Sequence, residues 1–359
     1  MVAGVAVGHS RETMTPKERR NAFAENRPYD RIPHGFALGD AASRVIGSNM
    51  AEFHCDPEKQ LKATLTAYKT YGLDSVGTTI PIQELVGATV IYPPYSTPYI
   101  RDTLELSEAD IDALGIDDPK SHPKMKRFWQ VLDGLLEAVG AEAPVSVSVG
   151  GPFSVAGRVI GTEKLMRKLL KEPEYVLKLV GKITEVQISV VNSLEGYGVS
   201  SFGITDPVAS GTLISPEQYR KFAKPYEKKL FNAMTRVAGR KPQCHICGDT
   251  NRILRDMVET GAGSISVDNM MDLDYVVSQV GTDAVVTGNV NPTETMLSGT
   301  SKDVREDLRN CLKKGSRALG GYTPSFGCGL PLNTPHENLV ALFDALWEFG
   351  KYPFNPENL

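Results

Sequence analysis

The sequence lacks the features that mark membrane, secreted or nucleic-acid-binding proteins. No apolar run approaches the roughly 20 residues that cross a bilayer. The apolar start at residues 2–7 is too short, and too soon followed by charge, for an export signal. The formal net charge is only −4 and the basic residues are scattered, which argues against a nucleic-acid-binding face. We therefore expect a cytoplasmic protein that binds neither membranes nor nucleic acids.

Cysteine is also scarce, with five in 359 residues. An odd number without an export signal predicts reduced thiols rather than a disulfide framework. Such thiols are available for metal or redox chemistry. Cys247 and Cys328 stand out by their positions, whereas Cys55, Cys244 and Cys311 are expected to pack in the interior.

Short apolar runs alternate with longer amphipathic ones along most of the chain. They follow a first helix that Thr15 caps and Pro16 begins, with Glu18 as the capping-box partner. The apolar runs predict strands at residues 34–38, 75–78, 145–149, 200–204, 241–245, 264–267, 284–288 and 322–326. The amphipathic runs predict helices at residues 57–71, 124–139, 173–196, 216–237, 250–260, 302–319 and 335–349.

Eight strands that alternate with helices imply parallel pairing. Closing these units gives an α/β fold, a (β/α)8 TIM barrel with an N-terminal helical extension. A doubly wound sheet is the rival, but no G-x-G-x-x-G motif follows the first strand. Residues 80–120 predict an inserted excursion, a candidate lid or dimer surface, so a homo-oligomer stays open. Without repeats or linkers, we expect a single barrel domain over residues 1–359.

One group of residues has the pattern of a metal site. His245 and Cys247 close the fifth predicted strand, where alternate side chains point the same way. Cys328 follows the eighth strand, so a barrel places all three at its C-terminal rim. One nitrogen and two sulfurs suit zinc, and three ligands leave a fourth position open for catalysis. Spacing alone leaves a second interpretation: a core histidine and two buried cysteines.

Four segments that together span nearly the whole chain carry further motifs. They are residues 14–33, residues 151–157 (Gly-Pro-Phe-Ser-Val-Ala-Gly), residues 288–293 (Gly-Asn-Val-Asn-Pro-Thr), and residues 328–331 (Cys-Gly-Leu-Pro) with Thr334-Pro335. These segments resemble the uroporphyrinogen decarboxylase superfamily. Within it, H-x-C with a distant cysteine resembles the zinc signature of the methylcobamide:coenzyme M methyltransferase branch. The segment Asp206-Pro207-Val208-Ala209-Ser210-Gly211 is similar to that branch too.

Two departures from the family pattern bear on substrate. Uroporphyrinogen decarboxylases carry Met-Arg-Gln-Ala-Gly-Arg after the first strand. The corresponding residues 37–44 here contain a single arginine, Arg44. A porphyrinogen bears many carboxylates that need fixed cations, so porphyrin decarboxylation is disfavoured. Asn291 stands where the family has Asp, which points to a different substrate preference if that loop touches the ligand.

The resemblance implies methyl transfer from a methylated corrinoid of the cobalamin type to a small-molecule thiol such as coenzyme M. A free thiol has a pKa of about 8.5, and zinc removes its proton. The sulfur then attacks the methyl group on Co(III), which releases a thioether and Co(I). The sequence has no Asp-x-His-x-x-Gly corrinoid-binding motif, so a separate corrinoid protein is the expected partner.

Three further residues lie just after predicted strands. We predict Asp206 and Asp268 as catalytic residues that orient ligands, and Asn289 as a cofactor-binding residue. A helix cap or a strand-end turn is the alternative for each.

Other functions stay open at this stage. Tetrahydrofolate is an alternative acceptor, and a demethylase of the same superfamily would move methyl groups onto Co(I) corrinoid. A non-catalytic protein that binds a zinc–thiol compound is the alternative from a different class.

Overall fold

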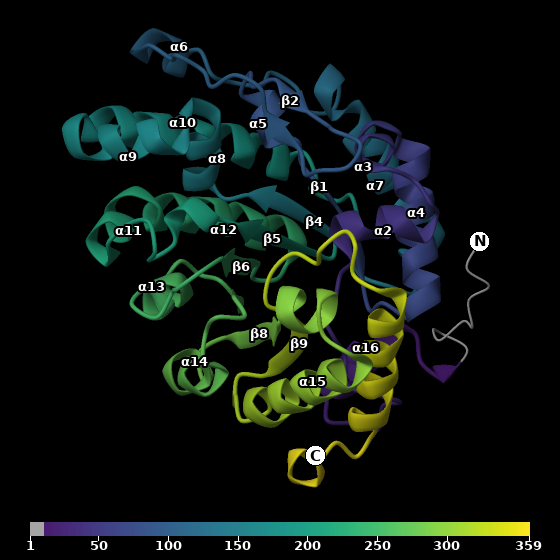
Figure 1. Ribbon diagram of the computed structural model, residues 1–359. Coiled ribbons are helices and arrows are strands. Elements are labelled where there is room, and N and C mark those ends of the chain that lie inside the picture. Colours follow the sequence, from purple (N-terminus) through teal and green to yellow (C-terminus); the bar gives the residue numbers. More distant parts are fainter. Residues whose placement is uncertain (1–10) are drawn as a thin grey trace. The chain divides into compact units, whose positions relative to one another are not determined.

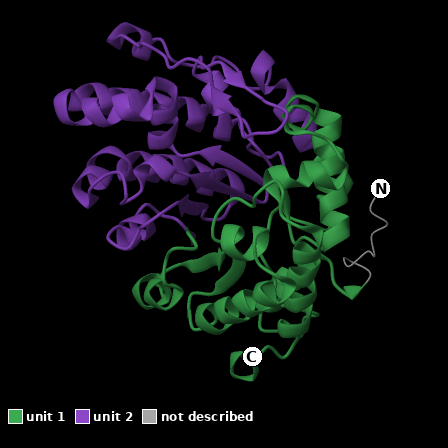
Figure 2. Cartoon of the chain, viewed as in Figure 1, with its two compact units in different colours: residues 1–77, 134–145, 266–359 green, residues 78–133, 146–265 purple. Residues whose placement is uncertain are grey.

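The computed structural model describes residues 11–359, so the apolar start at residues 2–7 lies outside it (Figure 1). Contacts divide the chain into two compact units (Figure 2). Unit 1 comprises residues 1–77, 134–145 and 266–359, and unit 2 comprises residues 78–133 and 146–265. The single barrel domain stays a prediction. No helix within residues 11–359 has the length and apolar character needed to cross a membrane.

Unit 2 has parallel strands covered by helices. β4 (Val145–Gly150) pairs with β5 (Ser201–Thr205), which pairs with β6 (Gln243–Ile246), both in parallel. In this register Thr205 lies opposite both Gly150 and His245, so the three strands end level with one another. Its longer helices are α8 (Pro152–Ile160), α9 (Thr162–Lys171), α10 (Pro173–Asn192), α11 (Pro216–Phe222), α12 (Lys224–Ala238) and α13 (Leu254–Glu259).

Unit 1 repeats this arrangement with fewer strands. β8 (Val285–Val290) pairs in parallel with β9 (Tyr322–Phe326), and α15 packs beside α16 (Figure 1). Its helices are α1 (Pro16–Ala24), α2 (Ala42–Val45), α3 (Met50–Cys55), α4 (Pro57–Tyr71), α14 (Leu273–Val280), α15 (Ser301–Gly315) and α16 (His336–Phe349), with the π-helical turn η5 (Pro292–Leu297).

The predicted alternation of strands and helices is confirmed. Within residues 11–359, seven strands share one sheet in the order β1-β4-β5-β6-β7-β8-β9, with β1 (Val76–Thr79) and β7 (Ser264–Val267) at the sequence boundaries of the units. The chain also crosses a boundary in α7 (Lys126–Val139). The first helix has the predicted capping box between Thr15 and Glu18.

The predicted strand at residues 34–38 is wrong, so the described sheet has seven strands rather than eight. Side chains occupy the backbone groups that a strand ladder would need. The His34 N–H donates to the Asp74 carboxylate at 2.8 Å, and the Phe36 N–H to the His34 ring at 3.1 Å. The Ser325 hydroxyl donates to the Gly35 carbonyl at 3.0 Å. Only the Gly35 N–H bonds to the β9 backbone, at Pro324.

The helical predictions also need correction. The predicted helix at residues 216–237 is broken at Ala223 into α11 and α12, because Pro225 has no N–H to continue the hydrogen bonds. Among the described helices of eight or more residues, α8, α9 and α14 were not predicted. The excursion at residues 80–120 is confirmed as irregular, with α5 (Ile82–Leu85), the antiparallel pair β2 (Val90–Ile91) and β3 (Tyr99–Ile100), and α6 (Glu108–Asp112).

Candidate metal centre

His245 and Cys247 lie at the end of β6. The side chains of Cys244 and Ile246 are fully buried, so strand alternation turns His245 to the other side of the sheet. His245 Nε2 and Cys247 Sγ are 3.2 Å apart, which agrees with the predicted H-x-C pair. The chain then turns at Gly248, whose φ of +80° favours glycine. A Cβ atom there would also lie only 2.8 Å from Ser210 Oγ.

Cys328 lies two residues after the end of β9. The N–H of Gly327 donates to the Val290 carbonyl at 2.9 Å and ties this loop to the end of β8. A Cβ atom at Gly327 would lie 2.4 Å from the Asn269 backbone nitrogen, so only glycine permits this approach. The glycine before Cys328 therefore fixes the path of the loop that carries the thiol.

His245, Cys247 and Cys328 form a group that could hold a metal ion. Each offers one ligand atom, and the three atoms lie within 4.8 Å of one another. All three side chains are half-buried. One imidazole nitrogen and two sulfurs at this separation fit zinc, which takes tetrahedral nitrogen and sulfur ligands.

The remaining cysteines divide into two kinds. Cys244 and Cys311 are buried, as predicted, but Cys55 is exposed at the end of α3, which corrects the expectation that it packs inside. Burial raises the pKa of the Cys244 thiol well above its usual value. Cys55, Cys244 and Cys311 do not belong to the candidate metal-ligand group.

Asp206 follows β5 and is completely enclosed. Its carboxylate accepts hydrogen bonds from the N–H groups of Phe153 and Ser154, at 3.3 and 2.7 Å, and from the Ser154 hydroxyl. It therefore caps the start of α8. Its own N–H donates to the His245 carbonyl at 2.9 Å. A Cβ atom at Gly151 would lie 2.2 Å from the Asp206 side chain, which explains the glycine there.

Glu227 interacts with Asp206, and Tyr219 interacts with Glu227. Neither residue was predicted from the sequence. The Tyr219 hydroxyl donates to Glu227 Oε2, and both side chains are fully buried. Burial, and then the charge of Asp206, raise the pKa of Glu227 well above its ordinary value. The available signal was an acid at helical spacing within an apolar stripe of α12, formed with Leu230, Phe231 and Met234.

Asp268 and Asn289 are joined to each other. Asp268, just after β7, accepts the Met270 N–H at 3.1 Å in a turn. The buried amide of Asn289 donates to the backbone carbonyls of Asp268 and Met271, at 3.1 and 2.8 Å. Asn289 therefore holds the turn after β7, which is the structural alternative noted from the sequence.

Asn291, the departure from the family pattern, is a cap. Its side-chain oxygen accepts the N–H groups of Thr293 and Glu294, and its amide donates to the Glu294 carboxylate at 3.2 Å. An aspartate could cap this turn equally, but it would repel Glu294. The cap gives this substitution a local explanation.

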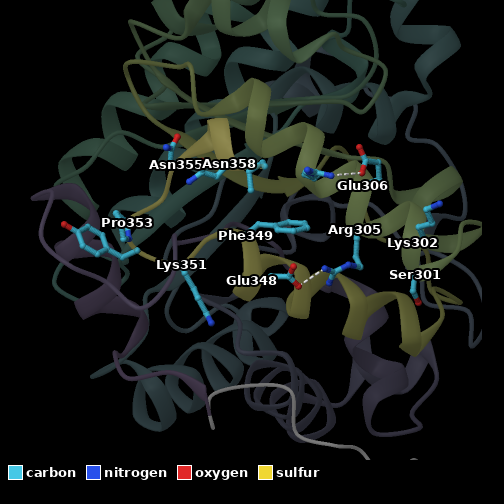
Figure 3. A pocket seen from close by; sticks show the side chains of 13 residues that line it. Ser301, Lys302, Arg305, Glu306, Glu348, Phe349, Lys351, Pro353, Asn355 and Asn358 are labelled. Atoms are coloured by element: carbon cyan, nitrogen blue, oxygen red, sulfur yellow. Dashed lines mark hydrogen bonds and ion pairs between the residues drawn. The ribbon is translucent and has the colours of Figure 1, made fainter.

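A separate hollow of about 810 Å³ lies in unit 1, between α15 and the C-terminal residues (Figure 3). Its wall includes Arg305 and Arg309, but both are paired with acids. Arg305 contacts Glu348 at 2.7 Å (Figure 3). Arg309 contacts Glu306 at 3.7 Å. Because both arginines are already paired with acids of the wall, the hollow is a weaker candidate than the metal-ligand group.

Comparison with known proteins defines the class of this chain. The model of the uroporphyrinogen decarboxylase (URO-D) family matches residues 15–349, so the chain belongs to that family. It is 28% identical to the methylcobamide:CoM methyltransferase MtbA of Methanosarcina acetivorans, over 92% of this chain and 97% of that protein. It is 26% identical to the methylcobamide:CoM methyltransferase MtaA of Methanosarcina barkeri, over 93% and 98%.

A solved structure agrees with these sequence matches. A methyltransferase from Methanosarcina mazei superposes with a TM-score of 0.79 and 25% sequence identity. The match covers 94% of this chain and 99% of that one. The resemblance predicted from the sequence is therefore confirmed at the level of the family and its methyltransferase relatives.

Proposed function

We propose that this chain is a zinc-dependent methyltransferase. It moves a methyl group from a methylated corrinoid, carried by a separate corrinoid protein, to a thiol such as coenzyme M. The observation that carries the proposal is the group formed by His245, Cys247 and Cys328. The methylcobamide:CoM methyltransferases named above support the choice of corrinoid and thiol. Reduced cysteines at the site suit a cytoplasmic enzyme.

The three ligands would hold zinc and leave one tetrahedral position for a substrate sulfur. Zinc, when bound, supplies the Lewis acidity that lowers the pKa of a substrate thiol from about 8.5. Two cysteine thiolates and a neutral imidazole balance the charge of the ion, which favours a sulfur nucleophile over an ether oxygen. In the transfer the carbon–cobalt bond breaks and the carbon–sulfur bond forms. The bonding pair stays on cobalt, and the thiol proton passes to solvent.

In this proposal Asp206, Asp268 and Asn289 help to position the metal ligands and the substrate. Their hydrogen bonds connect the ends of β5 and β7 to neighbouring turns and to the backbone of His245. Direct catalytic contact by Asp206 or Asp268, and cofactor binding by Asn289, stay predictions.

Zinc analysis of purified protein tests the ligand group. We expect about one zinc per chain, and most of it lost in His245→Ala, Cys247→Ala and Cys328→Ser because each removes one of three ligands. Cys55→Ser is the matched control, since it removes an exposed thiol outside the group. Full zinc retention in Cys328→Ser, with unchanged turnover, would eliminate Cys328 as a ligand.

A spectroscopic assay with methylcobalamin tests the reaction. We expect the methyl–cobalt spectrum to disappear on addition of coenzyme M. Disappearance only with tetrahydrofolate would redirect the acceptor, and methylation of Co(I) by a methylated compound would reverse the direction. No change with any of these would favour the non-catalytic zinc–thiol binder.

A further inference from the structure

Two buried carboxyl groups, on Asp206 just after β5 and on Glu227 of α12, interact directly with each other through a side-chain hydrogen bond. Asp206 and Glu227 are both fully buried. Among residues 11–359, no basic side chain forms an ion pair with either of them. Arg220 and Lys224, on the helices that carry Tyr219 and Glu227, pair with Asp256 and Glu259 instead. Two neighbouring carboxylates in such surroundings cannot both be charged at low cost, so one of them holds a proton.

The hydrogen bonds indicate which group holds that proton. Both oxygens of Asp206 already accept donors, from the start of α8. Glu227 Oε2 accepts the Tyr219 hydroxyl, but Oε1 is buried and meets no donor among the described residues. A buried carboxyl oxygen without a donor is satisfied when it carries a proton and becomes a donor itself. Burial and the charge of Asp206 raise the pKa of Glu227 well above its ordinary range, which agrees with this assignment.

We propose that Glu227 is a positioning residue for the candidate metal centre: as a neutral acid it donates a hydrogen bond to the Asp206 carboxylate and holds the end of β5 against β6. The Asp206 N–H then holds the His245 carbonyl, at 2.9 Å. Tyr219, fully buried on α11, fixes Glu227 from the other side. The inference rests on the proposed function only because it takes His245 as a zinc ligand.

The test measures zinc affinity of the full chain by competition with a chromogenic chelator. Glu227→Leu removes both hydrogen bonds, whereas Glu227→Gln keeps one N–H donor and one carbonyl acceptor. Groups that support metal ligands typically change metal affinity about 10–100-fold when removed. We expect Glu227→Leu to weaken zinc binding about tenfold or more, and Glu227→Gln to stay within about threefold of wild type.

Leu179→Ala is the matched control, because it removes a fully buried side chain of α10 in the same unit, outside this network. It should destabilise unit 2 and leave zinc affinity unchanged. The inference is overturned if Glu227→Leu binds zinc as wild type does, or loses no more affinity than Leu179→Ala. It is also overturned if Glu227→Gln fails to restore binding.

A metal-free measurement separates failure of this inference from failure of the proposed function. Infrared spectra at pH 7 should show the carbonyl stretch of a protonated carboxylic acid in the wild type and not in Glu227→Gln. If the wild type lacks that band, Glu227 is not protonated and the inference is overturned. A wild-type chain that binds no zinc overturns the proposed function, and the infrared band still decides the state of Glu227.

Discussion

Asp74 in unit 1 and Asp206 in unit 2 are both completely enclosed, but their surroundings balance the charge differently. Asp74 lies 2.8 Å from Arg31 and also contacts Arg19, so two buried cations face it. Asp206 faces backbone N–H groups, a serine hydroxyl and the neutral acid we assign to Glu227. The first cluster depends on ion pairing, and the second depends on a shared proton.

The pKa values of the two carboxyl groups shift in opposite directions. Burial alone would raise the pKa of Asp74, but the charges of Arg31 and Arg19 lower it below its ordinary value of 3.8. Burial raises the pKa of Asp206, which its hydrogen bonds with Ser154 and Phe153 only partly offset. The cation-paired cluster should therefore be stable at neutral pH, whereas the proton-sharing cluster should weaken as pH rises.

Asp74→Ala should have the largest effect. It leaves Arg19 and Arg31 buried without this partner, and breaking a buried ion pair costs about 3–5 kcal/mol of unfolding free energy. Urea denaturation of a Trp129→Phe background, which leaves Trp347 as the only tryptophan, reports this loss in unit 1.

The control for Asp74→Ala is the same change at an exposed ion pair. Asp344 contacts Arg11 at 2.7 Å near the surface of the same unit, so Asp344→Ala should cost about 1 kcal/mol or less. Equal losses from the two substitutions would contradict the view that the Asp74 cluster stabilises unit 1 through buried charges.

Both clusters were outside the reach of sequence reasoning, because their members are distant in the chain. The capping box at Thr15 and seven of the eight strands followed from local patterns. The strand at residues 34–38 failed because Asp74, 40 residues away, takes its backbone N–H. His245 and Cys247 were found because strand alternation is local, whereas Glu227 was hidden in the apolar stripe of α12.

Asp206→Asn should have an intermediate effect. One carboxylate oxygen becomes an NH₂ group, which donates hydrogen bonds instead of accepting them. The one remaining oxygen cannot accept both the α8 N–H groups and the proton of Glu227. Leaving a buried donor unsatisfied costs about 1–3 kcal/mol. The measurement is urea denaturation followed by Trp129 in a Trp347→Phe background, since Trp129 belongs to unit 2. Wild-type stability in this variant would mean that the capping bonds contribute little.

Glu227→Gln should have the smallest effect on stability at pH 5, and its main consequence should be a change in pH dependence. Near pH 5 we expect the variant to be within about 1 kcal/mol of wild type, because an amide replaces the hydrogen bonds of the neutral acid. The folded pKa of Glu227 is raised well above 4.5, so its contribution is complete below that pH and declines as pH rises toward the folded pKa.

The wild type should therefore lose stability relative to Glu227→Gln between pH 5 and pH 8. The slope is at most about 1.4 kcal/mol per pH unit for one proton. Urea denaturation followed by Trp129 across this range measures it. Glu163→Gln, which removes an exposed carboxylate of α9 in the same unit, should leave the slope unchanged. Parallel profiles for wild type and Glu227→Gln would show that Glu227 is ionised in the folded chain. The two clusters would then differ in their partners but not in their protonation.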